Sequence, residues 1–328
     1  MTSLAGKRVA VTRAVLVGGG IERLARSVDV HVWEGEREPD GADLRRLVTG
    51  AAALIPIGSD VIDAAVLEAG GPDLRVVALT SAGYDRVDLA AADRLGIQVT
   101  HTPGVLHRTV AEFALGAALA VRRRMVEGDR FVRRGQWRQQ DMNLLLGAGL
   151  HGGQLGVVGY GEIGAELARL AAAMGMTVVH HSRTRADHGA VRWVSLDDLL
   201  TTSDVVSLHV PLTPETVGLV GAREIALMRP DAVLLNTARG GVVDEVALAA
   251  ALDAGHLAGA ALDVFRDEPV GADGSPLLHS ERCLLTPHMA SASTETRSAM
   301  VELAVDNVLA VLSGRPPLTP VRPPVHSP

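Results

Sequence analysis

Several residue types on which whole classes of function depend are scarce in this chain. Among 328 residues there is one cysteine, Cys283, so no intrachain disulfide and no cysteine-rich zinc site can form. Lys7 is the only lysine. That excludes a Walker-type phosphate loop and argues against a pyridoxal Schiff base, because both need a lysine inside the site. Aromatic residues make up 2% of the chain, too few for the stacking surfaces that bind single-stranded nucleic acids.

Positive charge and long apolar runs are also lacking. The formal net charge is -7, which disfavours nucleic acids and anionic membranes as partners, since both attract basic surfaces. No apolar run reaches about 18 residues, the length needed to span a membrane, and no charged leader precedes an apolar segment. We therefore expect a cytoplasmic, unprocessed protein of two domains or one large one.

Short apolar runs rich in β-branched residues alternate with helical patterns along most of the chain, which predicts parallel α/β sheets. The strands expected in the first hundred residues are Arg8–Thr12, Asp29–Trp33, Ala52–Ile57, Arg75–Leu79 and Ile97–Thr100. The strands expected after residue 150 are Leu155–Gly159, Thr177–His181, Val205–His209, Ala232–Asn236, Ala258–Val264 and Leu284–Thr286.

Two long helices and a proline-rich end complete the pattern. We expect one helix at about Thr109–Arg134, whose basic end we interpret as a solvated face or subunit contact. A second, amphipathic helix is expected at Thr294–Leu312. The last stretch, Gly314–Pro328, is predicted to be a loosely ordered tail.

The segment Gly159–Gly164, of sequence GYGEIG, lies between an apolar run and a helical pattern. A glycine fingerprint in this context is typical of a dinucleotide-binding turn. Gly159 permits the tight turn, Gly161 lets the backbone approach a pyrophosphate, and Gly164 allows the helix to pack closely on the strand. The N-terminus of the helix then offers unpaired N–H groups to the phosphates.

The end of the next strand bears on which dinucleotide binds. In the NAD form of this motif an acidic residue there binds the ribose 2′-hydroxyl. Ser182 and Arg183 stand at that point instead. A hydroxyl and a guanidinium can hydrogen-bond a 2′-phosphate, which a carboxylate would repel. We predict NADP(H) as the preferred cofactor and NAD(H) as the second candidate; the alternative is that Arg183 and Arg185 are ordinary solvent-facing arginines of the loop.

Polar chemistry follows three consecutive strands of the second series. Arg239 comes after one strand, Asp263 and Glu268 after the next, and His288 after the last. Ligands of open parallel sheets bind outside the carboxyl ends of the strands, so we expect these side chains to converge beside the dinucleotide.

These residue types suit the reduction of a 2-oxo acid. The planar guanidinium of Arg239 would hold the substrate carboxylate and polarise the ketone. His288 would protonate the developing alkoxide, and Glu268 would keep the imidazole charged and oriented. A nicotinamide cofactor would supply the hydride.

At this point the chain resembles the D-isomer-specific 2-hydroxyacid dehydrogenases along nearly its whole length. Matching motifs stand in the family's order: Gly159–Gly164, Leu208–Thr216, Asn236–Gly241, Ala261–Phe265 with Glu268 and Pro269, and Thr286–His288. Ser81–Asp88 resembles the family's substrate-binding loop.

The resemblance implies roles for individual residues. Arg239, Glu268 and His288 would be the catalytic triad, and Asp263 would position the nicotinamide amide. Ser81, Ala82 and Gly83 would bind substrate together with Arg239, through the backbone N–H groups of Ala82 and Gly83. The residues expected to contact the cofactor are Gly159, Tyr160, Gly161, Glu162, Ile163, Gly164, Ser182, Arg183, Val210, Pro211, Thr216, Thr237, Ala238, Arg239, Asp263 and His288. No metal is expected.

The resemblance also implies an architecture: two doubly wound parallel-sheet domains, with a Rossmann cofactor domain inserted in a flavodoxin-like substrate domain. The predicted boundaries are 1–100 for the first part of the substrate domain, 101–290 for the cofactor domain and 291–328 for a returning helix and tail. Such enzymes are usually homodimers joined through their cofactor domains.

The departure at Ser182 and Arg183 resembles the NADPH-preferring glyoxylate/hydroxypyruvate reductase branch, which forms D-2-hydroxy acids. The alternative is a dinucleotide-sensing scaffold, like the transcriptional corepressors of this fold, which work by recruiting partners. S-adenosylhomocysteine hydrolase and alanine dehydrogenase chemistry both need an active-site lysine, which Lys7 in an N-terminal strand cannot supply.

Overall fold

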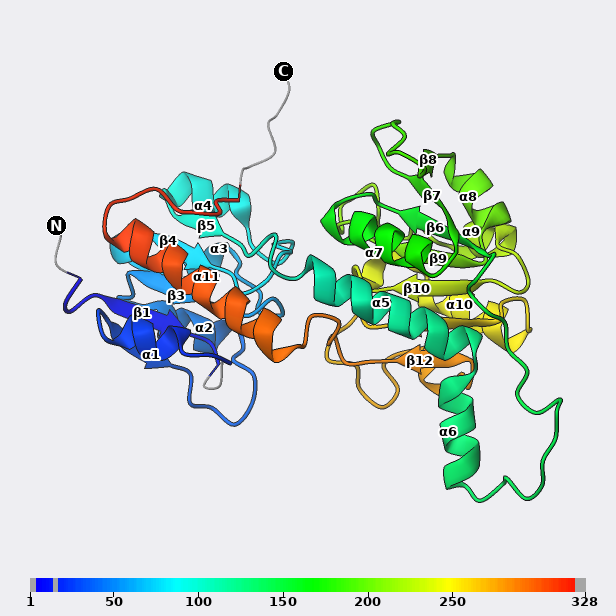
Figure 1. The fold of residues 1–328 in the computed structure, drawn as a ribbon. Helices are drawn as coiled ribbons and strands as arrows, with labels where there is room; N and C mark the ends of the chain where they lie inside the picture. The colour runs from blue at the N-terminus through cyan, green and yellow to red at the C-terminus, as the bar shows by residue number, and fades with distance from the viewer. Residues whose placement is uncertain (1–3, 14–16, 322–328) are drawn as a thin grey trace. The chain divides into compact units, whose positions relative to one another are not determined.

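The computed structural model describes residues 4–13 and 17–321, and the chain divides into two compact units (Figure 1). Unit 1 comprises Met1–Leu106 and Ala292–Pro328, and unit 2 comprises His107–Ser291. Each unit holds one parallel sheet with helices on both faces, so the predicted α/β class is confirmed. None of the helices in the described ranges is long and apolar enough to cross a membrane.

The sheet of unit 1 has five strands in the order β2-β1-β3-β4-β5, all parallel. This is the flavodoxin-like order. The strands are β1 (Arg8–Val11), β2 (Asp29–Val32), β3 (Ala53–Ile55), β4 (Val76–Ala78) and β5 (Gln98–Thr100). Each lies where the sequence predicts it, within one or two residues at either end.

Helices cover both faces of this sheet. On one face α1 (Gly20–Ala25) and α11 (Thr294–Leu312) pack on β1, β3 and β4. The other face is covered by α2 (Gly41–Val48), α3 (Ala64–Ala69) and α4 (Leu89–Leu95), with the short 3-10 helix η1 (Gly71–Asp73) between the last two. Asp40, Asp63 and Asp88 cap α2, α3 and α4, each accepting backbone N–H groups of the first turn, which fixes where these helices begin.

The sheet of unit 2 has seven parallel strands in the order β12-β11-β10-β9-β6-β7-β8. Read from β8 to β11, the six strands have the Rossmann order, and β12 is one further strand at the edge. The strands are β6 (Gln154–Val158), β7 (Thr177–His181), β8 (Arg192–Trp193), β9 (Val205–Leu208), β10 (Val233–Asn236), β11 (Gly259–Leu262) and β12 (Cys283–Leu285). The short strand β8 was not predicted from the sequence.

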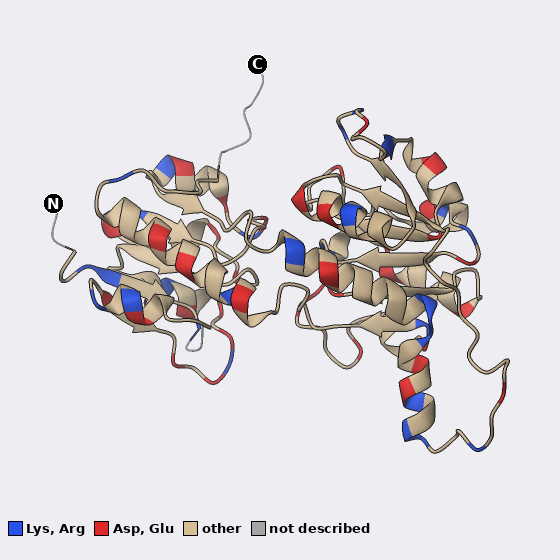
Figure 2. Ribbon diagram, in the orientation of Figure 1, with Lys and Arg blue, Asp and Glu red and all other residues tan. Residues whose placement is uncertain are grey.

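One face of this sheet is covered by α5 (His107–Arg122) and α7 (Glu162–Ala173), which lie side by side in Figure 1. The other face is covered by α8 (Leu196–Thr202), α9 (Ala222–Leu227) and α10 (Glu245–Asp253). Two 3-10 helices, η2 (Gly240–Val242) and η3 (Pro276–His279), lie in the loops. The central strands β9, β10 and β11 contain no charged residue, and Figure 2 shows the charges on the helices and loops around them.

The single helix predicted over Thr109–Arg134 is wrong: the segment forms α5 and a separate helix, α6 (Met125–Arg133). The N–H of Ala148 donates to the Arg122 carbonyl, which the helix would otherwise use itself, and Arg124 turns into the left-handed region at a φ of 52°. A contact from distant sequence therefore ends α5 where local propensity would continue it.

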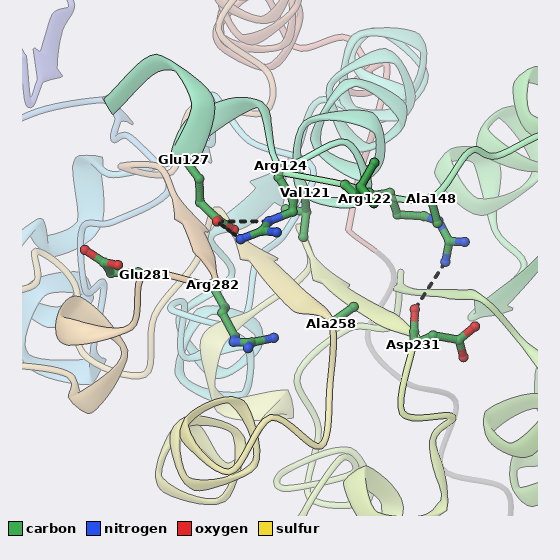
Figure 3. Close-up of a pocket in the computed structure, with 11 residues that line it drawn as sticks. Val121, Arg122, Arg124, Glu127, Ala148, Asp231, Ala258, Glu281 and Arg282 are labelled. Carbon is green, nitrogen blue, oxygen red and sulfur yellow. Dashed lines mark hydrogen bonds and ion pairs between the residues drawn. The ribbon is translucent and has the colours of Figure 1, made fainter. Parts of the chain in front are cut away.

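Arg122, expected on a solvated face or subunit contact, is instead 8% exposed. Its guanidinium donates to three carbonyls, those of Gly149, Asp204 and Asp231. Figure 3 shows the bond to Asp231 in a cavity at this end of the unit. Because Asp204 and Asp231 precede β9 and β10, the side chain ties together the amino ends of two central strands.

The described part of the predicted tail, 314–321, is also not loose. The N–H of Val321 donates to the Val99 carbonyl of β5. The fully buried Asn307 of α11 accepts the N–H groups of Leu318 and Thr319. These bonds fasten the segment to unit 1, because each satisfies a polar group that burial would otherwise leave unpaired. Residues 322–328 lie outside the described residues.

Replacing Arg122 with leucine should destabilise the protein by about 3 kcal/mol, because three carbonyls near the core lose a charged donor. Urea unfolding followed by circular dichroism measures the change. Arg133→Leu is the control, since its side chain is 76% exposed, and it should change stability by less than about 0.5 kcal/mol. Equal stabilities of the two variants would contradict this role.

Candidate active site

All strands of unit 2 run in the same direction, so their carboxyl ends lie at one edge of the sheet. That edge carries every predicted site residue of this unit. Gly159, Tyr160, Gly161, Glu162, Ile163 and Gly164 follow β6; Ser182 and Arg183 follow β7; Val210, Pro211 and Thr216 follow β9; Thr237, Ala238 and Arg239 follow β10; Asp263 and Glu268 follow β11; and His288 follows β12. Ser81, Ala82 and Gly83 belong to unit 1, where they follow β4.

The glycine turn between β6 and α7 has no room for larger residues at two positions. Gly159 has a φ of 93°, and a Cβ built there would lie 2.4 Å from the His209 carbonyl oxygen. A Cβ on Gly164 would lie 2.3 Å from the Gly159 carbonyl oxygen. By contrast, no atom lies within 4 Å of a Cβ built on Gly161. The turn is therefore tightly packed at Gly159 and Gly164 and open at Gly161, next to the N-terminus of α7.

Arg239 is placed by the loop after β10. The side chain of the buried Asn236 donates to the Arg239 carbonyl at 2.9 Å and accepts the N–H of Ala238 at 3.1 Å, which fixes the turn. The next residue, Gly240, lies against the loop after β11: a Cβ there would be 1.8 Å from the Phe265 carbonyl carbon. The two loops are thus in direct backbone contact.

The loop after β11 carries Glu268, whose carboxylate joins two segments. One oxygen, Oε1, accepts the N–H of Phe265 at 2.8 Å. The other, Oε2, lies 2.8 Å from Nδ1 of His288. The Glu268 side chain is 16% exposed and that of His288 48%. The histidine therefore has a fixed ring orientation, with Nε2 on the side away from the carboxylate.

Asp263 holds the backbone around His288. Its buried carboxylate accepts the hydroxyl of Thr286 and the N–H groups of Met289 and Ala290, each at 2.7 Å. Its carbonyl accepts the N–H of His288. His288 has a φ of 51°, a conformation that is strained for a residue with a side chain and that persists only where surrounding contacts enforce it. Asp263 supplies those contacts.

The loop after β7 is closed by side-chain bonds. The Ser182 hydroxyl donates to the Thr184 carbonyl at 2.8 Å, and the indole of Trp193 donates to the Ser182 carbonyl. The Arg185 guanidinium lies over the Trp193 ring. The neighbour of Arg183 is Glu215. A hydrogen bond from Thr213, together with the charge of Arg183, holds the pKa of Glu215 below its usual range.

The loop after β9 is folded on itself. The Thr216 hydroxyl donates to the Pro211 carbonyl at 2.6 Å and accepts the N–H of Thr213 at 2.8 Å. Val210 is half-buried and packs against the core of the unit. This loop lies beside the glycine turn, since the N–H of His209 donates to the Val158 carbonyl.

Comparisons with known proteins agree on one family. Residues 115–290 match the model of the D-isomer specific 2-hydroxyacid dehydrogenase, NAD binding domain. The chain is 42% identical to the glyoxylate reductase of Korarchaeum cryptofilum, over 97% of this chain and 98% of that protein. The chain belongs to the D-isomer specific 2-hydroxyacid dehydrogenase family.

Solved structures are similar over the same length. The TT0316 protein from Thermus thermophilus has a TM-score of 0.90 and 47% identity, covering 96% of this chain and all of that one. An NADPH-dependent glyoxylate/hydroxypyruvate reductase from Sinorhizobium meliloti, in complex with NADP and malonate, has a TM-score of 0.83 and 34% identity, covering 96% of each chain. This 2-hydroxyacid dehydrogenase homologue is an NAD(P)-dependent oxidoreductase.

The residues of the dehydrogenase fit a nicotinamide dinucleotide. The open space at Gly161 suits a pyrophosphate, and the N-terminus of α7 directly follows it. Farther along the same edge, the Thr237 hydroxyl is buried with no hydrogen-bond partner among the described residues. A buried hydroxyl in this state needs a partner, which a bound ligand or a water molecule can supply. When bound, the cofactor would supply or accept a hydride.

Two residues that hold the dehydrogenase loops were not assigned from the sequence. Glu245, in the first turn of α10, is 8% exposed and accepts the N–H of Arg266 and the hydroxyl of Ser275, bracing the loop that carries Glu268. Asn236 fixes the Arg239 turn. In the sequence, each of these two residues is only a polar residue beside apolar ones. That pattern does not reveal which loop the side chain contacts.

His209 keeps the glycine turn free of a further positive charge. Burial lowers its pKa to about 4, so the ring is neutral above about pH 5, and Nε2 lies 2.9 Å from the Ser207 hydroxyl. His209 therefore adds no positive charge beside the glycine turn above that pH.

The cavity in Figure 3 does not belong to this site. Its lining residues Asp231, Ala258 and Arg282 lie one or two positions before β10, β11 and β12, at the opposite ends of the strands from His288. Arg124 in this cavity is paired with Glu127. Within the described ranges, no cluster of three or more His, Cys, Asp or Glu side chains is arranged to hold a metal ion.

Gly164→Ala should weaken NADPH binding by about tenfold, because the added methyl group forces α7 away from the turn. Titration of the bound nicotinamide fluorescence measures the dissociation constant. Gly116→Ala, in the middle of α5 with no atom within 4 Å of the built Cβ, is the matched control and should leave affinity unchanged. Similar affinities for the two variants would refute the packing argument.

Proposed function

We propose that the protein transfers a hydride from NAD(P)H to a small 2-oxo acid, giving the D-2-hydroxy acid, with glyoxylate and hydroxypyruvate as substrates. The observation that carries this is the Glu268–His288 pair, held at 2.8 Å on the same sheet edge as Arg239 and the glycine turn. The names of the similar proteins support the substrate class, since several are glyoxylate or hydroxypyruvate reductases.

Each triad residue has a distinct role in the proposed reaction. Arg239 would bind the substrate carboxylate and polarise the ketone through its planar donors. The Nε2–H of His288 would give its proton to the ketone oxygen as the hydride reaches the carbon, so the product is a neutral hydroxyl. Glu268 would hold Nδ1 and stabilise the imidazolium before this transfer. Asp263 would position the nicotinamide amide, in addition to holding the loop that carries His288.

We infer that the two units bind different molecules. Unit 2 would be the cofactor domain, and its contacts would include the sixteen residues predicted from the sequence. Unit 1 would be the substrate domain, in which Ser81, Ala82 and Gly83 bind the substrate carboxylate. The family resemblance supports this assignment, and so does the Rossmann strand order of unit 2.

NADP(H) is the proposed preferred cofactor. The loop after β7 offers a hydroxyl at Ser182 and guanidinium groups at Arg183 and Arg185, with no carboxylate at the strand end. The solved Sinorhizobium reductase, 34% identical, is described as NADPH-dependent. Both observations favour a 2′-phosphate site, because guanidinium and phosphate form strong charge-assisted hydrogen bonds.

Assembly as a homodimer and a cytoplasmic location stay predictions. A run of exposed apolar side chains supports self-association through unit 2: Met125 and Val132 on α6, and Trp137, Met142 and Leu146 in the segment after it. Exposed apolar side chains that gather in one part of a surface are typical of protein–protein contacts.

The protein should oxidise NADPH, followed at about 340 nm, the nicotinamide band, in the presence of glyoxylate or hydroxypyruvate. His288→Ala should lower kcat by about 100-fold or more while NADPH still binds, because the proton donor is lost. A dinucleotide-sensing scaffold would instead keep nucleotide-linked binding and show no turnover in either form. Absence of turnover with every 2-oxo acid of a panel, with cofactor bound, would reject the proposed reaction.

Ser182→Asp combined with Arg183→Ala should change the ratio of kcat/KM for NADPH to that for NADH by about 100-fold in favour of NADH. The change removes a charged donor to the 2′-phosphate and adds a carboxylate that repels it. Steady-state kinetics with both cofactors give the ratio. Arg133→Ala, on α6 and paired with Asp129, is the control and should leave it as in the wild type. An unmoved ratio in the double variant means that the cofactor assignment is wrong.

A further inference from the structure

The loop after β4 in unit 1 contains the two backbone N–H groups that the proposed function assigns to the substrate carboxylate, those of Ala82 and Gly83. A backbone N–H has no rotation of its own. Because the peptide group is planar and trans, each N–H points opposite to the carbonyl of the preceding residue. Whatever holds the Ser81 and Ala82 carbonyls therefore aims the two donors.

The Ala82 carbonyl is held by a histidine. Nδ1 of His101 donates to it at 2.8 Å. Since this carbonyl belongs to the same peptide group as the Gly83 N–H, the bond fixes the direction of that N–H. The imidazole lies on the carbonyl side of the peptide and leaves the N–H side to a ligand.

The Ser81 carbonyl is held by the next residue along. The N–H of Thr102 donates to it at 2.9 Å, which fixes the direction of the Ala82 N–H. The Ser81 hydroxyl closes the loop by donating to the Gly83 carbonyl at 2.7 Å. Adjacent residues after β5, His101 and Thr102, thus set the two predicted carboxylate donors.

The His101 ring is confined on a second side. The ring of Tyr84 meets it edge-on, with centroids 5.5 Å apart and an angle of 83° between the planes. Tyr84 is part of the same loop, so the ring contact and the hydrogen bond act on residues only two apart.

The backbone of His101 is clamped in turn by the C-terminal segment. Its N–H donates to the Thr319 carbonyl at 3.2 Å, and the Thr319 hydroxyl donates to its carbonyl at 2.6 Å. The fully buried Asn307 donates to the Thr319 hydroxyl at 2.8 Å. The support runs from α11 through the C-terminal segment to the imidazole.

We propose that His101 is a positioning residue for substrate binding: through its bond to the Ala82 carbonyl it aims the Gly83 N–H at the carboxylate of the 2-oxo acid. This rests on the proposed function, which makes the loop a carboxylate site. Loss of the bond frees the peptide to rotate, so substrate affinity falls while cofactor binding, in unit 2, is unchanged.

Two substitutions separate the hydrogen bond from the bulk of the side chain. His101→Leu keeps most of the volume but has no donor, and should raise the KM for glyoxylate by about tenfold. His101→Asn places an amide nitrogen close to the position of Nδ1, and should return KM to within about threefold of the wild-type value. The KM for NADPH should stay within about twofold in both.

His256→Leu is the matched control. Nε2 of His256 also bonds a backbone carbonyl, that of Ile225, at 3.1 Å, but in unit 2 and away from the sheet edge that carries the site. Its KM for glyoxylate should equal that of the wild type. Should His101→Leu fail to bind NADPH or to fold, Thr319→Val decides instead: it removes one bond to the His101 backbone and should raise the KM for glyoxylate by about threefold.

The outcomes distinguish the two proposals. Wild-type protein that turns over no 2-oxo acid overturns the proposed function, and this inference with it. Wild-type turnover with an unchanged KM in His101→Leu overturns the positioning role alone. The same result follows if His101→Asn is as impaired as His101→Leu, or if His256→Leu raises KM equally.

Discussion

The site in unit 2 depends on one constraint, the common direction of the seven strands. Because every neighbouring pair is parallel, the strand ends deliver their following residues to one edge, although those residues are up to 129 positions apart, from Gly159 to His288. An antiparallel strand in place of β10, β11 or β12 would send Arg239, Glu268 or His288, respectively, to the edge where Arg122 lies. The backbone pairing, which carries no chemistry itself, decides which side chains meet.

Residue type and local pattern revealed much of this in advance. The limits of β7 and α11 were predicted to the residue, and Arg239, Glu268 and His288 were predicted to follow neighbouring strands, as they do, because charged residues stand out after apolar runs. Two of the predictions that failed have a similar cause. The end of α5 depends on Ala148, and the ordering of 314–321 depends on Asn307. These are contacts between segments that do not adjoin in the sequence, and no periodicity in either segment encodes them.

Buried polar side chains carry out most of the positioning. Asp263, Glu245 and Asn236 in unit 2 and Asn307 in unit 1 are all nine-tenths or more buried, and each accepts backbone N–H groups of a loop. Burial of a polar group is unfavourable unless its hydrogen bonds are made, so each of these side chains favours a single loop conformation. The loops are therefore defined by the core beneath them as well as by their own turn residues.

The contact at Gly240 has a consequence for how this enzyme can change. Since a methyl group there would overlap the Phe265 backbone, the two loops can keep this spacing only with glycine at position 240. A larger residue at position 240 would displace the loop with Arg239 against the loop with Glu268, so the two loops constrain each other's variation.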